Sequence, residues 1–399
     1  MTTPSNPPHI ALLLSGGGAR AAYQVGVLKA LAEMLPAQAS NPFRTICGTS
    51  AGGLNAAGIA THADNFQSGV QFLENIWANF STRQVYRTDL PGVWACALRF
   101  LATLLIGRLG KNHGVSLLDN RPLRTLLERH LDLSKLSTML DQGHLDALAI
   151  TASGYTTGES VSFFQGKDQL DGWKRSRRIG SKTQISFEHL MASAAIPVIF
   201  PAVRINREYF GDGAVRQLAP ISPALHLGAD RVLVIGVSSQ NNRKTREQVS
   251  QYPSIAQVVG HVMASSFVDS LEGDLERLNR VNHTISLIPE EVRARDGFSL
   301  KPVQVLSISP PGQVIETMAL RHVNALPSSI RMFVNGAGAT HKSGAGVLSY
   351  LLFEAEYCQA LIELGYIDAI SKRPQIEDFL ELPAARARHS DSLPRTNAG

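Results

Sequence analysis

Two glycine-framed segments near the N-terminus constrain the fold of this 399-residue chain more than any other feature. The apolar run from His9 to Leu14 leads into Gly16-Gly17-Gly18-Ala19-Arg20-Ala21, and the run from Phe43 to Cys47 leads into Gly48-Thr49-Ser50-Ala51-Gly52. Residues with helical spacing or small side chains follow each segment. A strand, a glycine loop and a helix, repeated in succession, are typical of an α/β fold with a largely parallel sheet.

The chain continues this alternation to about residue 237 and then becomes mostly helical. Further strands are predicted at Leu145–Ala152 and Arg231–Val237, more weakly at Val161–Phe164 and Val203–Ile205, and helices at 19–35, 119–131, 255–278 and 344–364. Polar segments at 238–253 and 290–302 are predicted to be loops, and the tail from Leu382 is predicted to be disordered. We therefore expect an α/β domain at 11–237, a largely helical C-terminal region at 238–382 and a tail at 383–399.

The composition is that of an ordinary globular protein, with 44% hydrophobic residues and a formal net charge of +5. This mild basic excess permits attraction to an anionic membrane, but the chain lacks the basic clusters that nucleic-acid binding needs. Its cysteines, Cys47, Cys96 and Cys358, form no C-x-x-C pair, which indicates reduced thiols rather than a zinc site or a disulfide framework. The N-terminus has no signal-peptide pattern, and the sequence predicts neither a metal site nor a cofactor.

The segment Gly48–Gly52 fits the G-x-S-x-G pattern of a nucleophile elbow. In such an elbow the serine occupies a strained strand-to-helix turn, glycines relieve the steric clashes, and the helix N-terminus favours developing negative charge. The pattern alone recurs by chance, but here an apolar strand precedes it and a helix of small residues follows it. Ser50 is therefore predicted to be the nucleophile of an acyl-transfer reaction.

The segment Gly16–Ala21 has two interpretations. It fits the dinucleotide-binding pattern G-x-G-x-x-G/A, but that site also needs an acidic residue after the second strand, where this chain has Ser50. The backbone N–H groups of the loop therefore suit an oxyanion better than a pyrophosphate. Two roles stay open for Arg20: it faces the oxyanion or a lipid phosphate, or it supports the loop by hydrogen bonds to carbonyl groups.

The base that would activate Ser50 is predicted to be Asp212. A serine–histidine–acid triad would need a later histidine in a suitable loop. The candidates considered after Ser50 lie in no distinctive loop: His261, His283, His322 and His341. Asp212, by contrast, is flanked by Gly211 and Gly213, which leave its carboxylate at a turn that other backbone can approach closely.

In their order and separations, these motifs resemble those of the patatin-like phospholipases, a family of serine acyl hydrolases that use a Ser–Asp dyad without histidine. The segments that carry the resemblance are Gly16–Ala21, Gly48–Gly52, Leu117–Leu123, Ala192–Pro201 and Asp212–Ala214. The resemblance covers about Ala11 to Val237, and we recognise no motif from Ser238 onward.

The resemblance implies a three-layer α/β/α sandwich with a mostly parallel central sheet. It implies Ser50 as nucleophile and Asp212 as general base, with Gly48, Gly52 and Gly213 as elbow and turn glycines. It implies an oxyanion hole in the first loop and at the elbow, formed chiefly by backbone groups: Gly16, Gly17, Gly18, Ala19, Arg20 and Ala51.

The expected activity is hydrolysis of phospholipid or lysophospholipid esters through an acyl-enzyme, in lipid catabolism or membrane lipid remodelling. A carboxylesterase or thioesterase for soluble esters is an alternative with the same dyad. A second alternative is a regulator that binds a lipid or a nucleotide and in which the Ser–Asp dyad is no longer catalytic.

The apolar segment Leu90–Leu109 is short for a membrane span and carries Arg99 at its centre. One interpretation is an interfacial anchor or lid, with Trp94 and Phe100 at the headgroup boundary and basic residues near phosphates: Arg99, Arg108 and Lys111. The other is a core helix that packs on the sheet. The expected location is the cytoplasm, with peripheral contact at the inner face of the membrane under the first interpretation.

Overall fold

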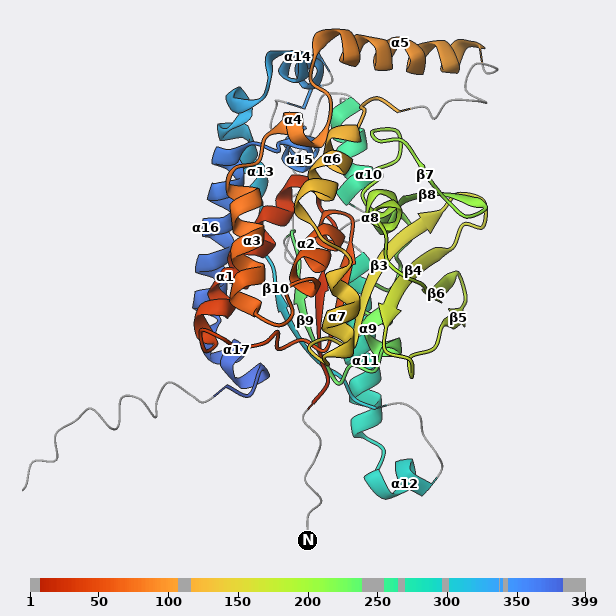
Figure 1. The fold of residues 1–399 in the computed structure, drawn as a ribbon, viewed down its shortest axis with the longest axis vertical. Helices are drawn as coiled ribbons and strands as arrows, with labels where there is room; N and C mark the ends of the chain where they lie inside the picture. The colour runs from red at the N-terminus through yellow and green to blue at the C-terminus, as the bar shows by residue number, and fades with distance from the viewer. Residues whose placement is uncertain are drawn as a thin grey trace, which may run out of the picture.

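The structure is a computed structural model that describes residues 8–106, 116–238, 255–264, 270–295, 301–336, 338–339 and 344–382. Its centre is a ten-stranded sheet (Figure 1). Eight strands follow the order β10-β9-β1-β2-β3-β4-β6-β5, and the β7–β8 hairpin adds the other two through β3. The strands are β1 (Ile10–Leu14), β2 (Thr45–Thr49), β3 (Ala147–Gly154), β4 (Ser160–Gly166), β5 (Trp173–Arg175), β6 (Arg178–Lys182), β7 (Val203–Ile205), β8 (Glu208–Asp212), β9 (Arg231–Ile235) and β10 (Gln304–Ile308).

Helices cover both faces of this sheet. The N-terminal half contains η1 (Gly18–Ala21), α1 (Ala22–Met34), α2 (Ala51–Ala60), α3 (Phe66–Ala78), α4 (Thr82–Val85), α5 (Leu90–Ile106), α6 (Arg121–His130), α7 (Lys135–Asp141), α8 (Phe187–Ser193), η3 (Gly213–Val215) and α9 (Ser222–His226). The C-terminal part contains α10 (Ile255–Ala264), α11 (Ser270–Ser286), α12 (Glu290–Arg295), α13 (Val314–Arg321), η5 (Val323–Ala325), α14 (Ser328–Gly336), α15 (Ala345–Leu351), α16 (Ala355–Ser371) and α17 (Arg373–Phe379).

Five neighbouring strands, β10, β9, β1, β2 and β3, run parallel, which fits the predicted alternation of strands and helices. Beyond β3 the sheet becomes mixed, because β4 and β8 pair with β3 in the antiparallel sense. The carboxyl ends of β1, β2 and β3 therefore meet at one edge of the sheet, where the two glycine segments follow β1 and β2.

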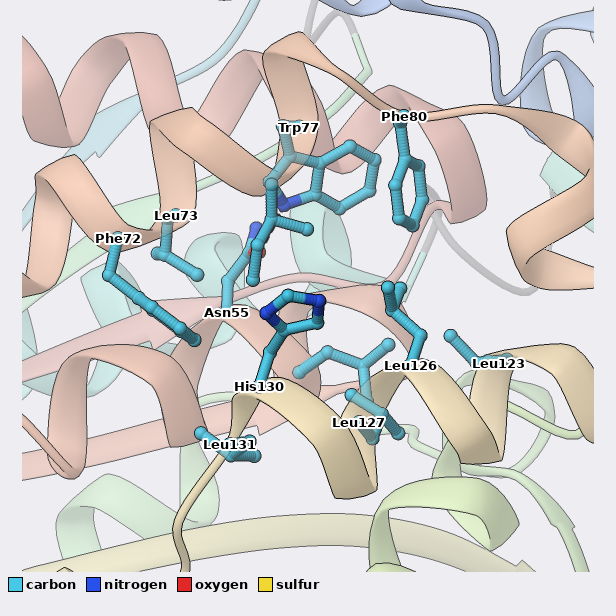
Figure 2. Close-up of a pocket in the computed structure, with 12 residues that line it drawn as sticks. Asn55, Phe72, Leu73, Trp77, Phe80, Leu123, Leu126, Leu127, His130 and Leu131 are labelled. Atoms are coloured by element: carbon cyan, nitrogen blue, oxygen red, sulfur yellow. Dashed lines mark hydrogen bonds between the residues drawn. The ribbon is translucent and has the colours of Figure 1, made fainter.

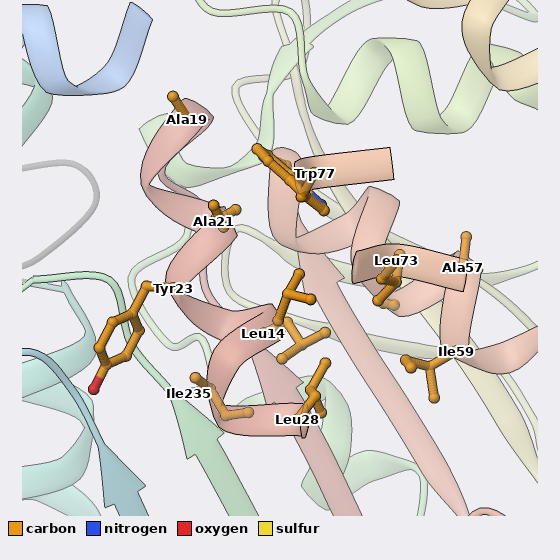
Figure 3. Close-up of a cluster of buried hydrophobic side chains, with 14 of the residues drawn as sticks. Leu14, Ala19, Ala21, Tyr23, Leu28, Ala57, Ile59, Leu73, Trp77 and Ile235 are labelled. Atoms are coloured by element: carbon orange, nitrogen blue, oxygen red, sulfur yellow. The ribbon is translucent and has the colours of Figure 1, made fainter. Parts of the chain in front are cut away.

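Both faces of the parallel strands are buried, so the molecule has a hydrophobic core on each side of the sheet. In β1, Leu12 and Leu14 belong to one core and Leu13 to the other, as the alternation of a strand requires. Figure 3 shows part of the larger core, in which Leu14 lies near Leu28 of α1 and Leu73 of α3. The smaller core includes residues of α9 and α11. Helices on both sheet faces confirm the predicted three layers.

Residues after Ser238 contribute to this same architecture. β10 pairs with β9 in parallel, and α16 lies along α1 in the helical layer (Figure 1). The two helices approach closely at glycines: a Cβ atom on Gly26 would lie 1.8 Å from the carbonyl oxygen of Ile362, and one on Gly365 would lie 2.1 Å from that of Tyr23. The division at residue 237 stays a prediction, while the sheet and the larger core continue across it.

Most predicted elements are confirmed, and three differ. The predicted helix 344–364 is interrupted between Leu351 and Ala355, where the buried Phe353 turns into the core. The predicted loop 290–302 is wrong over Glu290–Arg295, since good helix formers follow Pro289 and form α12. The predicted helix 255–278 corresponds to α10 and α11, and residues 265–269 between them lie outside the described part. Most of the predicted loop 238–253 and the whole tail 383–399 also lie outside it.

The predicted helix in the apolar segment is confirmed as α5, which projects from the body of the molecule in Figure 1. Leu90 and Leu98 are 51% and 60% exposed, which does not fit a core helix packed on the sheet. Arg108 and Lys111 lie outside the described residues. Among the described helices, none is long and apolar enough to span a bilayer.

Candidate functional site

Ser50 stands between the end of β2 and the start of α2, in a backbone conformation that side chains rarely adopt. Its φ of 56° and ψ of −133° are those of a strained turn. Flanking glycines permit this turn, because a Cβ atom on Gly48 would lie 2.5 Å from the carbonyl oxygen of Gly52. A Cβ atom on Gly52 would in turn lie 2.4 Å from the carbonyl oxygen of Leu14 in β1. The predicted elbow is thus present, and no larger residue fits at either glycine.

Asp212, at the end of β8, lies beside this serine although 162 residues separate them in the sequence. The Ser50 hydroxyl donates to Asp212 Oδ2 at 2.6 Å, and the backbone N–H of Ala214 donates to Oδ1 at 3.0 Å. The strand pair β3–β8 fixes the position of the carboxylate, with Asp212 opposite Ala152. Gly213 must lack a side chain, since its Cβ would lie 2.1 Å from the carbonyl oxygen of Thr151.

The Asp212 carboxyl is fully buried, and its environment changes its acidity. Burial raises the pKa of Asp212 from its ordinary value of 3.8 to about 7, because desolvation penalises the charged form. Hydrogen bonds from Ser50 and from the Ala214 amide act in the opposite direction and lower the pKa. A carboxylate with such a pKa can exchange a proton with a neighbouring hydroxyl near neutral pH.

Ser193 supports the elbow, and the sequence did not single it out. Its Oγ accepts a hydrogen bond from the backbone N–H of Ser50 at 2.8 Å and donates to the carbonyl oxygen of Thr151 at 2.6 Å. Ser193 therefore ties the elbow to β3. It lies in the segment 192–201 that carries part of the family resemblance, but nothing in that segment reveals which backbone group the hydroxyl meets.

The first glycine loop lies directly beside Ser50. Gly16–Ala19 are buried, Gly18 has a φ of 53°, and Gly18, Ser50 and Ala51 line one pocket. Among the described residues, no acceptor is recorded for the backbone N–H groups of Gly17, Gly18 or Ala51. The loop and the elbow thus offer backbone donors next to the serine hydroxyl, as an oxyanion requires.

Arg20 supports the loop. Its guanidinium bonds to side chains and to one carbonyl group in later segments of the chain. It donates to Ser349 Oγ, Ser238 Oγ and Glu316 Oε1, each at 2.9 Å, and lies 4.1 Å from the ring centroid of Tyr350. Its side chain is only 4% exposed. Of the two roles left open for Arg20, the structure favours that of a support.

The pocket that contains Ser50, named here the Ser50 pocket, is largely apolar. Besides the glycine loop and the elbow, it is lined by Leu54, Trp77, Phe80, Val85, Leu123, Ala194, Ile196, Phe200 and Phe353. Phe353 packs edge-on against Phe80, with 5.7 Å between ring centroids. The region after residue 238, where the sequence shows no motif, therefore contributes a wall of the site.

Within the described part of the chain, no histidine is recorded as a hydrogen-bond partner of Ser50 or Asp212. Of the four histidines considered from the sequence, His322 bonds through Nδ1 to the carbonyl oxygen of Met318 in the preceding helix α13, and His341 lies outside the described residues. The described residues also contain no group of three or more His, Cys, Asp or Glu side chains placed to hold a metal ion.

Comparisons with known proteins agree with this geometry. The family model described as "Patatin-like phospholipase" matches residues 12–225, which include both glycine segments and Asp212. The chain therefore belongs to the patatin-like phospholipase family. A curated relative, a cGAMP-activated phospholipase of Pseudomonas aeruginosa (strain BWHPSA011 / Pa011), is 29% identical over 220 residues, which are 55% of this chain and 56% of the relative. The chain thus matches about half the length of that relative.

Similar solved structures include two proteins of low sequence identity. Human GIVD cytosolic phospholipase A2 is 12% identical, with a TM-score of 0.45 over 94% of this chain and 60% of that one. VipD from Legionella pneumophila is 15% identical, with a TM-score of 0.35 over 90% of this chain and 67% of that one.

Proposed function

We propose that the protein is a lipid acyl hydrolase of phospholipase A or lysophospholipase type, with Ser50 as nucleophile and Asp212 as general base. The observation that carries this proposal is the 2.6 Å hydrogen bond from the Ser50 hydroxyl to a buried carboxylate, at a strained elbow beside backbone amides for which the described part of the chain records no acceptor. Membership in the patatin-like phospholipase family supports the same reaction.

The proposed reaction has two halves. Asp212 accepts the hydroxyl proton as Ser50 Oγ bonds to the ester carbonyl carbon, and the carbonyl oxygen takes up the electron pair and faces the amides of Gly17, Gly18 and Ala51. Collapse of this intermediate breaks the ester bond, and the proton passes from Asp212 to the departing alkoxide. A water molecule then attacks the acyl-enzyme, Asp212 accepts its proton, and the acid is released as the proton returns to Ser50.

A lipid substrate is favoured over a soluble ester by the walls of the Ser50 pocket. Aliphatic and aromatic side chains form most of this lining, and they offer few hydrogen bonds to a polar acyl group. An apolar chain gains roughly 0.8 kcal/mol for each methylene group that it buries. The soluble carboxylesterase or thioesterase stays the alternative with the same dyad.

The experiment is release of free fatty acid from a panel of phospholipids and lysophospholipids, by wild type, Ser50→Ala and Asp212→Asn after a fold check. Each protein is assayed with and without cGAMP, because the curated relative is described as cGAMP-activated. We expect wild-type turnover that both variants lose. Turnover of short soluble esters alone would favour the alternative, and activity that survives Asp212→Asn would contradict the dyad.

We also propose that the protein acts in the cytoplasm and contacts the inner face of the membrane through α5. Support comes from Leu90 and Leu98, large apolar side chains that are more than half exposed on a projecting helix (Figure 1). Arg99, next to Leu98, is exposed and can meet lipid phosphates. Three buried cysteines without disulfides fit a reducing compartment.

Flotation with anionic vesicles tests this contact. Leu90→Asp/Leu98→Asp should lose at least about half of the vesicle-bound fraction, because two charges replace the apolar contact. A matched control, Leu287→Asp/Ile367→Asp, changes two leucine or isoleucine side chains of similar exposure elsewhere, and it should bind like wild type. Equal binding by the folded α5 variant would exclude α5 as the contact.

A further inference from the structure

Both members of the dyad are positioned against the same edge of β3. β2 pairs with β3 as far as Thr49, which lies opposite Thr151, and β8 pairs with β3 as far as Asp212, which lies opposite Ala152. Because β4 occupies the other edge of β3 at both positions, β2 and β8 end on the same edge and approach each other from opposite directions. Ser50 and Asp212 therefore leave the sheet at neighbouring positions.

The nucleophile side of this junction has several supports beyond the sheet. Ser193 accepts a hydrogen bond from the backbone N–H of Ser50. Further along α2, Asn55 Oδ1 accepts from Trp77 Nε1 at 2.8 Å, and Asn55 Nδ2 donates to Gln24 Oε1 at 2.9 Å. Asn55 thereby ties α2 to Trp77 of α3 (Figure 2) and to α1. These supports hold the elbow without involving Asp212.

The base side is held differently, because residues 213–218, which follow Asp212, come close to the surface. Val215 and Leu218 are 44% and 63% exposed. Between them, Gln217 is only 7% exposed. Gln217 is thus the residue at which this segment turns a long polar side chain into the molecule.

The partner of Gln217 is Thr49, the residue that precedes the nucleophile. Thr49 Oγ1 donates to Gln217 Oε1 at 2.7 Å, and both side chains are buried. Within the described residues, the other side-chain bond recorded from this segment to another element is longer, 3.3 Å from Ser153 Oγ to the carbonyl oxygen of Gly213. The Thr49–Gln217 bond therefore links the strand before the nucleophile to the segment after the base.

This bond lies on the opposite face of the sheet from the reacting groups. Thr49 alternates with Cys47, which belongs to the smaller core, whereas Asp212 pairs with Ala152 of the larger core. Neither Thr49 nor Gln217 lines the Ser50 pocket. Their effect on the reaction would therefore be exerted through the dyad and not through contact with substrate.

We propose that Thr49 and Gln217 are positioning residues, whose hydrogen bond holds the Asp212 segment against the Ser50 elbow and keeps the dyad within bonding distance. This inference rests on the proposed hydrolase function and adds two residues to it. Misplacing a reacting group by about 1 Å can cost roughly a hundredfold in rate, so a buried bond that joins the segments of both dyad members affects turnover.

The test compares kcat and KM for p-nitrophenyl butanoate in wild type, Thr49→Val, Thr49→Ser and Gln217→Met. Thr49→Val keeps the shape of the side chain but removes the hydroxyl. It should lower kcat by at least about tenfold while KM stays within about twofold, because the dyad and not the pocket is disturbed. Gln217→Met should have the same effect. Thr49→Ser keeps the hydroxyl and should retain at least about half of the wild-type kcat.

Thr61→Val is the matched control. Thr61 lies at the other end of α2, is as buried as Thr49, and donates its hydroxyl to the carbonyl oxygen of Ala57. Loss of this hydroxyl should leave kcat unchanged. Unchanged kcat in folded Thr49→Val, or an equal loss in Thr61→Val, would overturn the proposal.

A second measurement separates the positioning role from the reaction. Asp212→Asn removes a buried carboxylate, so it should stabilise the protein against denaturant at pH about 8. If Thr49→Val loosens the Asp212 segment, water reaches the carboxylate, and the gain from Asp212→Asn becomes smaller in that background. A smaller gain supports the positioning role even without turnover, whereas an equal gain in both backgrounds contradicts it.

Discussion

At the residue scale, the pKa of Asp212 must satisfy two opposing requirements. A base must accept a proton from Ser50, which favours a high pKa, and it must be ionised when substrate arrives, which favours a low one. Complete burial raises the pKa of Asp212 to about 7, while hydrogen bonds from Ser50 and the Ala214 amide limit the increase. The carboxylate is thereby matched to proton transfer near neutral pH without a histidine.

The first prediction concerns the pH dependence of activity. Only the ionised Asp212 can accept the Ser50 proton, so kcat/KM should fall about tenfold for each pH unit below the pKa and level off above it. With the pKa raised to about 7, the midpoint should lie near neutrality. We would measure kcat/KM on a soluble ester across this range. A midpoint near 4, the range of an ordinary aspartate, would show that burial does not tune this base.

The second prediction concerns stability. Because the pKa of Asp212 is raised from 3.8 to about 7 on folding, the native state holds a proton that the unfolded state releases between these values. Stability from this group is therefore lost as pH rises through that window, on the order of 4 kcal/mol in full. Asp212→Asn should be more stable than wild type by at least about 1 kcal/mol at pH about 8, as denaturant unfolding would show.

The control is to repeat the comparison of Asp212→Asn with wild type at a pH where Asp212 carries no charge in either state. Below about pH 3 the Asp212 carboxyl is neutral in both states, so the advantage of Asp212→Asn should vanish there. A constant difference between the two proteins at all pH values would contradict the cost assigned to the buried charge.

At this scale the sequence predicted that Ser50 and Asp212 lie together, but not which residues hold them in place. Ser50 and Asp212 were predicted as the dyad because each lies among glycines, and the close contacts of Gly52 and Gly213 show why no side chain fits at those two positions. Ser193 and the partners of Arg20 were not found. Their contacts depend on the approach of segments far apart in the chain, and a single sequence has no periodic signal for such approaches.

At the scale of elements, α1 and α16 approach each other closely, and this contact depends on glycine. Gly26 and Gly365 face the backbone of the opposite helix, where a Cβ atom would lie about 2 Å from a carbonyl oxygen. The helices can therefore pack backbone to backbone only because neither position has a side chain.

The third prediction follows from this crossing. In an isolated helix, Gly→Ala stabilises by up to about 1 kcal/mol, but Gly365→Ala should destabilise this protein by several kcal/mol because the helices must separate. Gly273→Ala in α11 is the matched control: nothing lies within 4 Å of its Cβ position, so it should be neutral or stabilising. Unfolding by denaturant measures both. A neutral Gly365→Ala would mean that the helices do not cross this closely.

Elements with a strong apolar pattern were predicted, and those without one were not. β1, β9 and β7 were recovered because short apolar runs end at glycine or polar residues. β5 and β6 were missed, since Trp173–Arg175 and Arg178–Lys182 are short, partly exposed strands rich in basic residues, and β5 forms the edge of the sheet. β10 was missed because two of its five residues are polar, a pattern that is also typical of loops. Its pairing with β9 is visible only in the structure.

At the scale of the whole molecule, the segment after residue 238 completes the site. Phe353 lines the Ser50 pocket, and Ser349 and Glu316 bind the guanidinium of Arg20 beneath the glycine loop. A Cβ atom on Gly18 would lie 2.3 Å from the carbonyl oxygen of Tyr350. The C-terminal helices therefore contact the loop directly, and their position affects the geometry of its amides.

The fourth prediction tests this connection. Arg20→Met leaves Glu316 without its cation and should destabilise the protein by about 2–4 kcal/mol. The double variant Arg20→Met/Glu316→Leu should recover about 1 kcal/mol or more relative to the sum of the single variants. Thermal or denaturant unfolding of the four proteins gives the coupling. Additive effects would mean that the ion pair does not hold the loop to α13.

The most direct test of the Ser50–Asp212 dyad is mass spectrometry after treatment with a long-chain alkyl fluorophosphonate. We predict a single adduct on wild type, mapped to Ser50, no adduct on Ser50→Ala, and labelling slowed by about a hundredfold or more in Asp212→Asn. The fold of each variant would be checked by circular dichroism. An adduct at another residue, or labelling of Ser50 at an unchanged rate in folded Asp212→Asn, would contradict the assignment of Asp212 as the base.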